Sequence, residues 1–445
     1  MVDKSDIYIK DLLEFLRIPT VSTDSAYKEG IVKGAGWLAE ELKKSGMENV
    51  EIMETAGNPV VYADWLHQPG KPTFLIYGHY DVQPPDPLGL WTTSPFEPEI
   101  RDDKVYARGA TDDKGQLLIH VKAVASLMEE YGELPVNVKF CLEGEEEIAS
   151  PNLVPFVKKH KEKLSCDAVL VSDTPMMDKE TPAIVTGLRG ALAFEMNVIT
   201  ASSDLHSGAY GGAVPNAVHH LVKLLDSLHD DEGKITVDGF YEGVPEVTNA
   251  LREEMARLPF SEEETKRELG LSSLYGEKGY TPLEQIGIRP TMEFNGIKGG
   301  YQGEGMKTII PKEASAKISC RLVGEQHPSY VFERIREHVA AFTPEGATVT
   351  LDKLIEAKAV TMDPDNEYIQ KAARAYENFY ENETLFPKEG GSIPIIEVFR
   401  GELDSEPVLM GFGLQSENMH APDEHFNLSN FRRGIKTVKN YFESF

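Results

Sequence analysis

Hydrophobic residues in the first part of the chain switch between helical spacing and short, unbroken apolar runs. From Ile7 to Leu16 the apolar positions fall mostly at helical spacing, and Pro19 ends the segment. Helical spacing returns over Ala35–Lys44 and Gln116–Tyr131. Four apolar runs predict buried strands: Val60–Trp65, Thr73–Tyr77, Asn137–Leu142 and Ala168–Val171. The alternation predicts an α/β domain with a mixed, mostly parallel sheet and flanking helices.

The pattern changes after residues 187–190. Shorter strand-like and helix-like runs now follow one another, as in a small α+β domain. We expect strands over Ala191–Thr200, Ala314–Val323 and Ala347–Leu354, and helices over Pro215–Leu228 and Tyr330–Phe342. Between them, residues 230–301 contain the acidic, helix-like run Ser261–Leu269 and several glycines, which we interpret as a surface elaboration.

The last part of the chain returns to the first pattern. Strands are expected over Ile393–Val398 and Val408–Phe412, and a closing helix over Asn430–Phe442. Residues 1–187 and 386–445 are therefore expected to form one domain, and residues 188–385 a second domain inserted into it.

Composition narrows the range of functions. With 445 residues, the chain has room for about two to three domains. Its formal net charge of −28 disfavours binding to nucleic-acid phosphates or to an anionic membrane surface. The cysteines lie in apolar runs without a Cys-x-x-Cys pair, and neither a signal-peptide pattern nor an apolar run of membrane length is found. We therefore expect a cytoplasmic protein without nucleic-acid or membrane partners.

Acidic residues and histidines follow three of the expected strands. His79 comes just after the run that ends at Tyr77, and an acidic cluster at 143–147 follows the next strand. Asp173 follows the strand after that. Because an open α/β sheet places its ligand crevice beyond the carboxyl ends of its strands, these side chains are expected at one edge.

Two further residues complete a candidate metal site. Asp112 precedes the helix that starts at Gln116, and His420 follows a late strand through a polar loop. The full donor set contains only imidazoles and carboxylates, which suits zinc, manganese or cobalt: His79, Asp112, Glu147, Asp173 and His420. Two neutral imidazoles and three carboxylates leave a charge of +1 on two divalent ions. This balance favours a two-metal site.

Each of these residues also has an ordinary structural interpretation. Asp112 could cap the helix that follows, residues 145–147 could be a solvent-exposed acidic run, and His79 could be a hydrogen-bonded core histidine. These roles do not explain why five ligand-type residues lie at the ends of separate elements.

The same segments suggest a base and a positioning residue. Glu146 stands beside Glu147 and is the natural base for a metal-bridging water whose pKa the ions lower. Asp81 lies two residues beyond His79, so in an extended segment both face the same side, and its carboxylate could hold the imidazole.

Several motifs resemble those of the co-catalytic di-metal metallopeptidases, the family of aminoacylase, succinyl-diaminopimelate desuccinylase and the carnosinase-type dipeptidases. The resemblance spans nearly the whole chain and is greatest for the cytosolic dipeptidase branch. It is carried by the segments 78–82, 108–115, 143–147, 204–208, 307–311, 321–323 and 390–394. It implies a zinc-peptidase-like catalytic domain with an inserted lid or dimerisation domain.

The resemblance also implies roles for individual residues. His79, Asp112 and Asp173 would hold one metal, and Asp112, Glu147 and His420 the other, with Asp112 bridging. Glu146 would be the general base, and Asp81 would steer His79. His206, in the inserted domain, would reach the active site of the partner subunit of a homodimer and stabilise the oxyanion. The substrate carboxylate would be bound by Arg321, with Thr308 and Ser392 nearby.

Two assignments stay open at this point. Glu145 makes three acids in a row, so the base and the ligand could each be one position earlier. His425 competes with His420 as the second histidine ligand.

The prediction is therefore a metal-dependent hydrolase of dipeptides or short peptides, with two divalent ions, zinc first and manganese or cobalt as alternatives. Asp173 favours substrates with a free amino terminus, because the related deacylases and carboxypeptidases tend to have Glu at this ligand. The alternatives are an N-acyl amino acid deacylase or desuccinylase, and a non-catalytic metal-binding protein.

Overall fold

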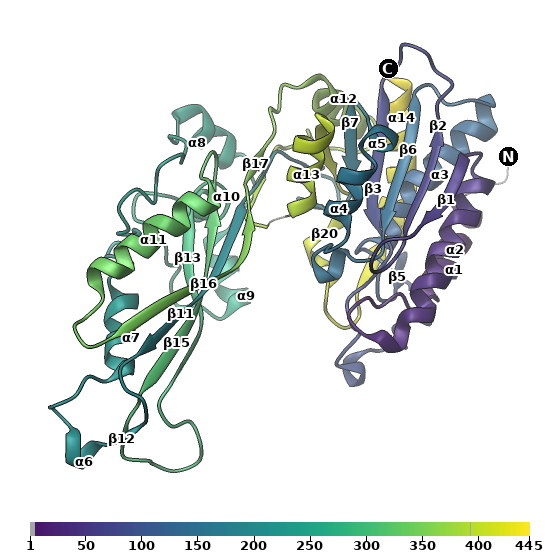
Figure 1. Cartoon of the computed structure of the whole chain (residues 1–445). Coiled ribbons are helices and arrows are strands. Elements are labelled where there is room, and N and C mark those ends of the chain that lie inside the picture. Colours follow the sequence, from purple (N-terminus) through teal and green to yellow (C-terminus); the bar gives the residue numbers. More distant parts are fainter. Residues whose placement is uncertain (1–4, 392) are drawn as a thin grey trace. The chain divides into compact units, whose positions relative to one another are not determined.

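The computed structural model describes residues 5–391 and 393–445 (Figure 1). The chain forms two compact units. Unit 1 contains the residues up to Thr186 together with Met362–Pro387 and Ile395–Phe445, and unit 2 contains Gly187–Thr361 and Lys388–Pro394.

The inserted domain is not one continuous segment, and Lys388–Pro394, expected in the catalytic domain, belongs to unit 2. Residues 362–385 were expected in the inserted domain, but Met362–Pro387 packs with unit 1. Helix α12 (Glu367–Glu377) explains the difference, because it buries Ile369 and Tyr376 and brings Tyr368 to 5.8 Å from the ring of Phe74 in unit 1. Its alternation of apolar and polar residues is helical and does not by itself show which domain it packs against.

A seven-stranded sheet forms the centre of unit 1. Its four middle strands are parallel to one another. An antiparallel hairpin-like pair lies on one side of them and a single antiparallel strand on the other. The strand order is β1 (Glu48–Met53), β2 (Val60–Trp65), β6 (Asn137–Glu143), β3 (Thr73–His79), β7 (Ala168–Val171), β19 (Glu406–Met410) and β9 (Ile184–Val185). This confirms the predicted mixed, mostly parallel α/β sheet.

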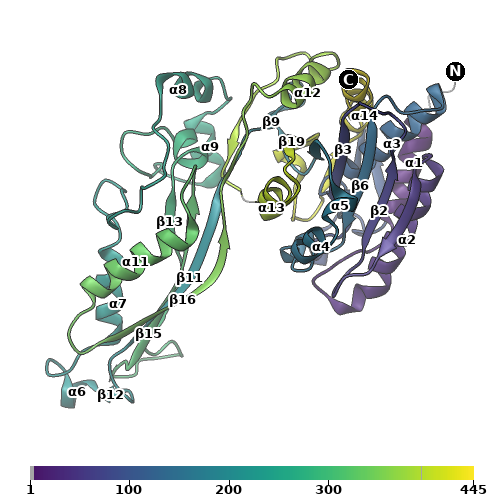
Figure 2. The ribbon, with the colours of Figure 1, turned by 45° about the horizontal axis from the view of Figure 1, so that its top comes forward.

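Helices cover both faces of this sheet, as Figures 1 and 2 show. Phe74 and Tyr77 lie on opposite faces of β3, because they are three residues apart in a strand. The Phe74 ring packs 5.4 Å from Tyr441 of α14, whereas Tyr77 packs 5.2 Å from Phe399 of α13. The helices of unit 1 besides α12 are α1 (Ser5–Leu16), α2 (Lys28–Lys44), α3 (Lys114–Tyr131), α4 (Leu153–Lys159), α5 (Lys161–Leu164), α13 (Pro394–Leu403) and α14 (Leu428–Glu443).

One expected strand of unit 1 is a helix. The segment Ile393–Val398 was predicted as a strand, but from Pro394 onwards it forms the start of α13. Its buried residues, Ile395, Ile396, Phe399 and Leu403, follow helical spacing, and Pro394 stands at the first helical position, where proline is well tolerated.

Unit 2 is built on a four-stranded antiparallel sheet. The strand order is β13 (Thr291–Gly299), β15 (Glu313–Leu322), β11 (Gly190–Ile199) and β16 (Thr348–Ala357). Alternate residues of β11, such as Phe194 and Met196, are buried in a core shared with α7 (Ala217–Asp226) and α11 (Pro328–Phe342). The other helices of the unit are α6 (Ser207–Tyr210), α8 (Asn249–Ala256), α9 (Glu262–Leu269) and α10 (Pro282–Gly287).

Residues 230–301 are more than a surface elaboration. Strand β13, which lies within them, pairs along its whole length with β15. The sequence conceals this strand because its pairing shifts between Phe294 and Gly296, which interrupts the alternation of apolar and polar residues.

Short strands complete the fold. One three-stranded ladder joins β4 (Glu99–Arg101), β5 (Lys104–Tyr106) and β21 (His425–Asn427), and another joins β17 (Val360–Thr361), β10 (Gly187–Leu188) and β18 (Lys388–Glu389). Two further pairs are β20 (Gly413–Leu414) with β8 (Pro175–Met176), and β12 (Leu205–His206) with β14 (Ile309–Ile310). No helix in the described ranges is both long and apolar enough to span a membrane.

Candidate metal centre

The carboxyl ends of three neighbouring parallel strands carry candidate ligands. His79 is the last residue of β3, and Asp173 follows β7 by two residues. Glu146 and Glu147 follow β6 in a short 3₁₀ helix, Glu146–Ile148. Since β6, β3 and β7 are adjacent and parallel, these side chains meet at one edge of the sheet, as expected.

Asp112 lies between two histidines. Its Oδ1 is 3.1 Å from Nε2 of His79, and its Oδ2 is 2.8 Å from Nε2 of His420. Oδ2 of Asp173 is 3.9 Å from the same atom of His79, and Oε2 of Glu147 is 3.4 Å from that of His420. The five residues therefore form two groups of three ligand atoms, each within 4.8 Å of one another, that share Asp112.

The hydrogen bonding of His79 fits a metal ligand. Its Nδ1 donates to the backbone carbonyl of Asp81 at 3.1 Å, which leaves the lone pair on Nε2. That Nε2 atom is fully buried and makes no hydrogen bond to any described residue. A buried acceptor without a donor is costly, and a divalent ion between His79 and the carboxylates would satisfy it.

The electrostatics of the group also fit a bound cation. Burial, followed by the charge of Asp112, raises the pKa of Asp173 and of Glu147 to about 8. A hydrogen bond with Asp112 raises the pKa of His420 to about 9. Burial raises the pKa of Asp112, but its hydrogen bond with His420 and the nearby imidazole of His79 outweigh burial and lower the pKa. Carboxylates crowded in this way require positive charge nearby.

Asp81 holds two parts of the site together. Its carboxylate accepts the backbone N–H groups of Glu146 and Glu147, both at 3.1 Å, and lies 3.5 Å from Nδ1 of His79. The imidazole of His79 donates its hydrogen bond to the backbone carbonyl of Asp81, whereas the Asp81 carboxylate was expected to be the acceptor. The carboxylate chiefly positions the segment with the candidate base.

The three consecutive glutamates have different surroundings. Glu145 accepts hydrogen bonds from Asn58 N at 2.9 Å and from Asn152 Nδ2 at 2.8 Å. Glu147 accepts from the backbone and side-chain amides of Gln83, and also faces His420. Glu146 makes no hydrogen bond through its side chain to a described residue, and burial raises its pKa. These surroundings favour Glu146 as the base and Glu147 as the ligand over an assignment one position earlier.

His425 is not placed to compete with His420. It lies in β21, where its Nδ1 donates to the backbone carbonyl of Asp423 at 3.0 Å. Its Nε2 accepts from Lys104 at 3.2 Å, so both ring nitrogens are used.

Sequence reasoning missed a buried carboxylate that positions Asp112. Glu424 accepts the backbone N–H groups of Gly109, Thr111 and Asp112 at 3.0, 3.1 and 3.2 Å, and Arg108 donates to it at 2.6 Å. It is completely buried. Its proximity to His420 in the sequence was a possible signal, but its partners lie more than 300 positions away.

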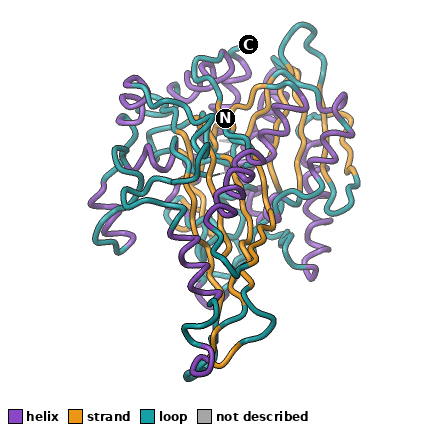
Figure 3. Tube along the Cα trace, turned by 60° about the vertical axis from the view of Figure 1, so that its left-hand side comes forward, coloured by secondary structure: helices purple, strands orange, loops and turns teal. Residues whose placement is uncertain are grey.

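The candidate residues of unit 2 fall into two places. His206 pairs with Ile309 in the β12–β14 pair, next to Thr308, whose carbonyl accepts the N–H of Ser207. This tip, defined as β12, α6 and β14, lies at one end of the long strands (Figure 3). His206 is exposed, and its Nδ1 accepts the N–H of Gly208 at 3.0 Å.

Thr308 is not near Arg321, although the two were expected together. Thr308 precedes β15, whereas Arg321 stands near the other end of this strand, opposite Ala191. At about 3.3 Å per residue, Glu313 and Arg321 alone are roughly 26 Å apart. Ser392, the third expected substrate residue, lies outside the described residues.

The fold and the site together define a class of protein. A mixed α/β sheet places two histidine–carboxylate groups, joined by one aspartate, beyond its strands. This donor set, with a separate glutamate beside it, is that of a two-metal hydrolase.

Comparison with known proteins identifies the family. The chain belongs to peptidase family M20/M25/M40, which matches residues 75–444. The expected family and the expected function, metal-dependent hydrolysis of peptide bonds, are thus confirmed.

Three relatives illustrate the similarity. The Cys-Gly metallodipeptidase of Candida albicans is 30% identical, over 98% of this chain and 93% of its own. The human Beta-Ala-His dipeptidase is 30% identical, over 86% of this chain and 77% of its own. The crystal structure of an M20 family metallo-carboxypeptidase from Sulfolobus solfataricus has 33% identity and a TM-score of 0.85, with 98% of both chains covered.

Proposed function

We propose that this enzyme hydrolyses dipeptides or short peptides with a free amino terminus at the metal centre of unit 1. The observation that carries the proposal is the placement of Asp112, with one oxygen beside His79 and the other beside His420. His79 and Asp173 would complete one ion site, and Glu147 and His420 the other. Zinc is the first choice for this donor set, with manganese or cobalt as alternatives.

Two ions bound there would polarise the scissile carbonyl and make an attacking water more acidic. Glu146 is the residue that accepts the proton from this water and passes it to the leaving amine. Asn58 binds the carboxylate of Glu145 and Gln83 that of Glu147, whereas neither binds the carboxylate of Glu146. Burial raises the pKa of Glu146 above its ordinary value, which makes this carboxylate a stronger base.

The separation of Thr308 from Arg321 supports a substrate site completed by a second subunit. His206 and Thr308 share the tip of unit 2, so both would enter the active site of the partner in a homodimer. His206 would stabilise the oxyanion there, and Arg321 would bind the substrate carboxylate with its guanidinium group. Ser392 would be a further residue that contacts the substrate. The proposed location of the enzyme is the cytoplasm.

Two observations bear on the substrate. Two of the three relatives described above are dipeptidases by name, and Asp173 is the ligand expected where the substrate has a free amino terminus. The second candidate is a carboxypeptidase, which the Sulfolobus structure favours at 33% identity. An N-acyl amino acid deacylase would use the same machinery.

Product analysis distinguishes these substrate classes. Metal-loaded protein is incubated with free dipeptides, N-blocked tripeptides and N-acetyl or N-succinyl amino acids, and the products are measured by mass spectrometry. We expect cleavage of the free dipeptides. Release of only the last residue from N-blocked tripeptides would indicate a carboxypeptidase, and cleavage of only the acylated amino acids a deacylase. No cleavage with zinc, manganese or cobalt would contradict the proposal.

A further inference from the structure

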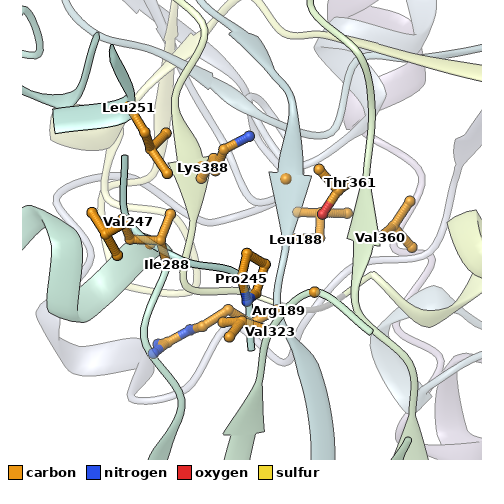
Figure 4. A pocket seen from close by; sticks show the side chains of 13 residues that line it. Leu188, Arg189, Pro245, Val247, Leu251, Ile288, Val323, Val360, Thr361 and Lys388 are labelled. Carbon is orange, nitrogen blue, oxygen red and sulfur yellow. The ribbon is translucent and has the colours of Figure 1, made fainter. Parts of the chain in front are cut away.

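Unit 2 contains a cavity of about 240 Å³ whose wall is mostly apolar (Figure 4). Leu188, Val247, Leu251, Ile288 and Val360 form much of this wall. The cavity shares no residue with the metal centre, since all its lining residues belong to unit 2. It is therefore unexplained by the proposed reaction.

The cavity borders three of the four places where the chain passes from one unit to the other. Leu188 is in β10, Val360 is in β17 and Lys388 is in β18, and each strand begins or ends at a boundary between the units. These strands form one ladder, in which Leu188 is paired with Val360 and Gly187 with Lys388. An occupant would contact these three connections, whereas the fourth, between Pro394 and Ile395, does not line the cavity.

Two cationic side chains line the cavity, but only one is available to a ligand. Arg189 donates from Nε to the carbonyl of Gly390 at 3.1 Å and from its guanidinium to that of Gln285 at 3.4 Å. Its stem lines the wall, while its guanidinium group turns away from the Lys388 side of the cavity in Figure 4.

Lys388 is placed differently. Figure 4 shows its side chain between Leu251 and Leu188, and its ammonium group forms no hydrogen bond or ion pair with a described residue. The charge of Glu254 acts on it from beyond ion-pair distance, and burial lowers its pKa. A partly buried ammonium without a partner is unfavourable, and an anion in the cavity would relieve this.

The lining restricts the chemistry of the occupant. None of the described residues that form the wall carries a carboxylate, so a ligand with its own ammonium group, such as a free amino acid, would lack a counter-ion. By volume, a cavity of about 150 Å³ holds benzene, so one of 240 Å³ holds roughly ten non-hydrogen atoms.

We propose that this cavity binds a small apolar carboxylate, with its carboxylate on Lys388 and its hydrocarbon part against Leu188, Leu251 and Val360. The site goes beyond the proposed hydrolase activity and does not depend on it. Because the ligand touches three of the four connections between the units, its binding is expected to alter the turnover of peptide substrates.

Octanoate is a suitable probe, because it has the expected size and a single negative charge. Its binding to the metal-loaded protein is measured by isothermal titration calorimetry, beside octanamide and 2-aminooctanoate. We expect octanoate to bind about tenfold or more tightly than either analogue. Lys388→Met should remove this preference, and Leu251→Trp, which fills the cavity, should abolish binding. Lys298→Met, at an exposed lysine of the same unit, is the control and should change neither.

Several results would overturn the proposal. One is the absence of octanoate binding at millimolar concentration, and another is equal affinity for octanamide. Unchanged octanoate affinity in the Lys388→Met variant would also reject it, provided that circular dichroism shows the variant to be folded. Octanoate could instead bind the metals, so the titration is repeated with saturating acetohydroxamate, a metal-binding compound. Loss of octanoate binding under that condition would place it at the metal centre.

Discussion

The metal centre of unit 1 and the tip of unit 2 hold their candidate catalytic residues in opposite ways. His79 is completely buried and lies 3.5 Å from the Asp81 carboxylate, which itself accepts the backbone N–H groups of Glu146 and Glu147. His206 is exposed and keeps a single bond to the N–H of the nearby Gly208. All the candidate metal ligands therefore come from one chain. The tip, in contrast, presents His206, whose proposed role requires the active site of a second subunit.

The largest effect at the metal centre is expected when the candidate base is replaced. Glu146→Gln keeps the shape of the side chain but cannot accept a proton, so we expect kcat to fall about 10²–10⁴-fold with metal content unchanged. Glu145→Gln is the matched control, because that carboxylate binds Asn58 and Asn152 and should affect stability more than turnover. The assignment is wrong if Glu145→Gln abolishes turnover while Glu146→Gln retains it. Steady-state kinetics and metal analysis decide between them.

The corresponding test on the exposed side is His206→Ala. Removal of an oxyanion donor should lower kcat about 10²–10³-fold, while thermal stability and metal content stay unchanged because the side chain is exposed. Gel filtration should give a dimer for both proteins.

Mixing two inactive variants tests whether His206 acts across subunits. A dimer of one His206→Ala chain and one Glu146→Gln chain contains one active site with both residues intact. After exchange of subunits at equal concentration, about a quarter of wild-type activity should return, since half the dimers are mixed and each has one intact site. If His206 served its own chain, no activity would return.

Glu424→Gln tests whether Glu424 positions the segment that carries the bridging ligand Asp112. Glutamine lacks the charge that binds Arg108 and the N–H groups of Gly109, Thr111 and Asp112, so the segment that carries Asp112 loses support. Metal affinity should fall about 10–100-fold, as is usual when a residue that orients a ligand is changed. Competition with a chelator measures this. Glu333→Gln, on the surface of unit 2, is the control. Unchanged affinity would mean that Asp112 is positioned without Glu424.

Much of unit 1 and its site could be predicted from local sequence. The strand Ala168–Val171 was predicted with its observed bounds, because four consecutive apolar residues between polar ones leave little choice. His79 and Asp173 follow from their positions after such strands. Glu424 could not be found in this way, because its role comes from contacts with Arg108 and Gly109 far along the chain. The helix at Pro394 was missed because tertiary packing overrode the β-branched residues.

The smallest expected effect concerns protons released when metal binds. Asp173 and Glu147, with pKa values of about 8, hold protons at pH 7 in the metal-free protein, and so does His420, with a pKa of about 9. Each must lose its proton to become a ligand, so metal binding should release about two or more protons at pH 7, and affinity should rise with pH between 6 and 8. Groups with ordinary pKa values would release only about half a proton from the two histidines. Calorimetry in buffers of different ionisation enthalpy counts the protons. A value below one would show that the carboxylates are already ionised without metal, and that the crowding around Asp112 is relieved in some other way.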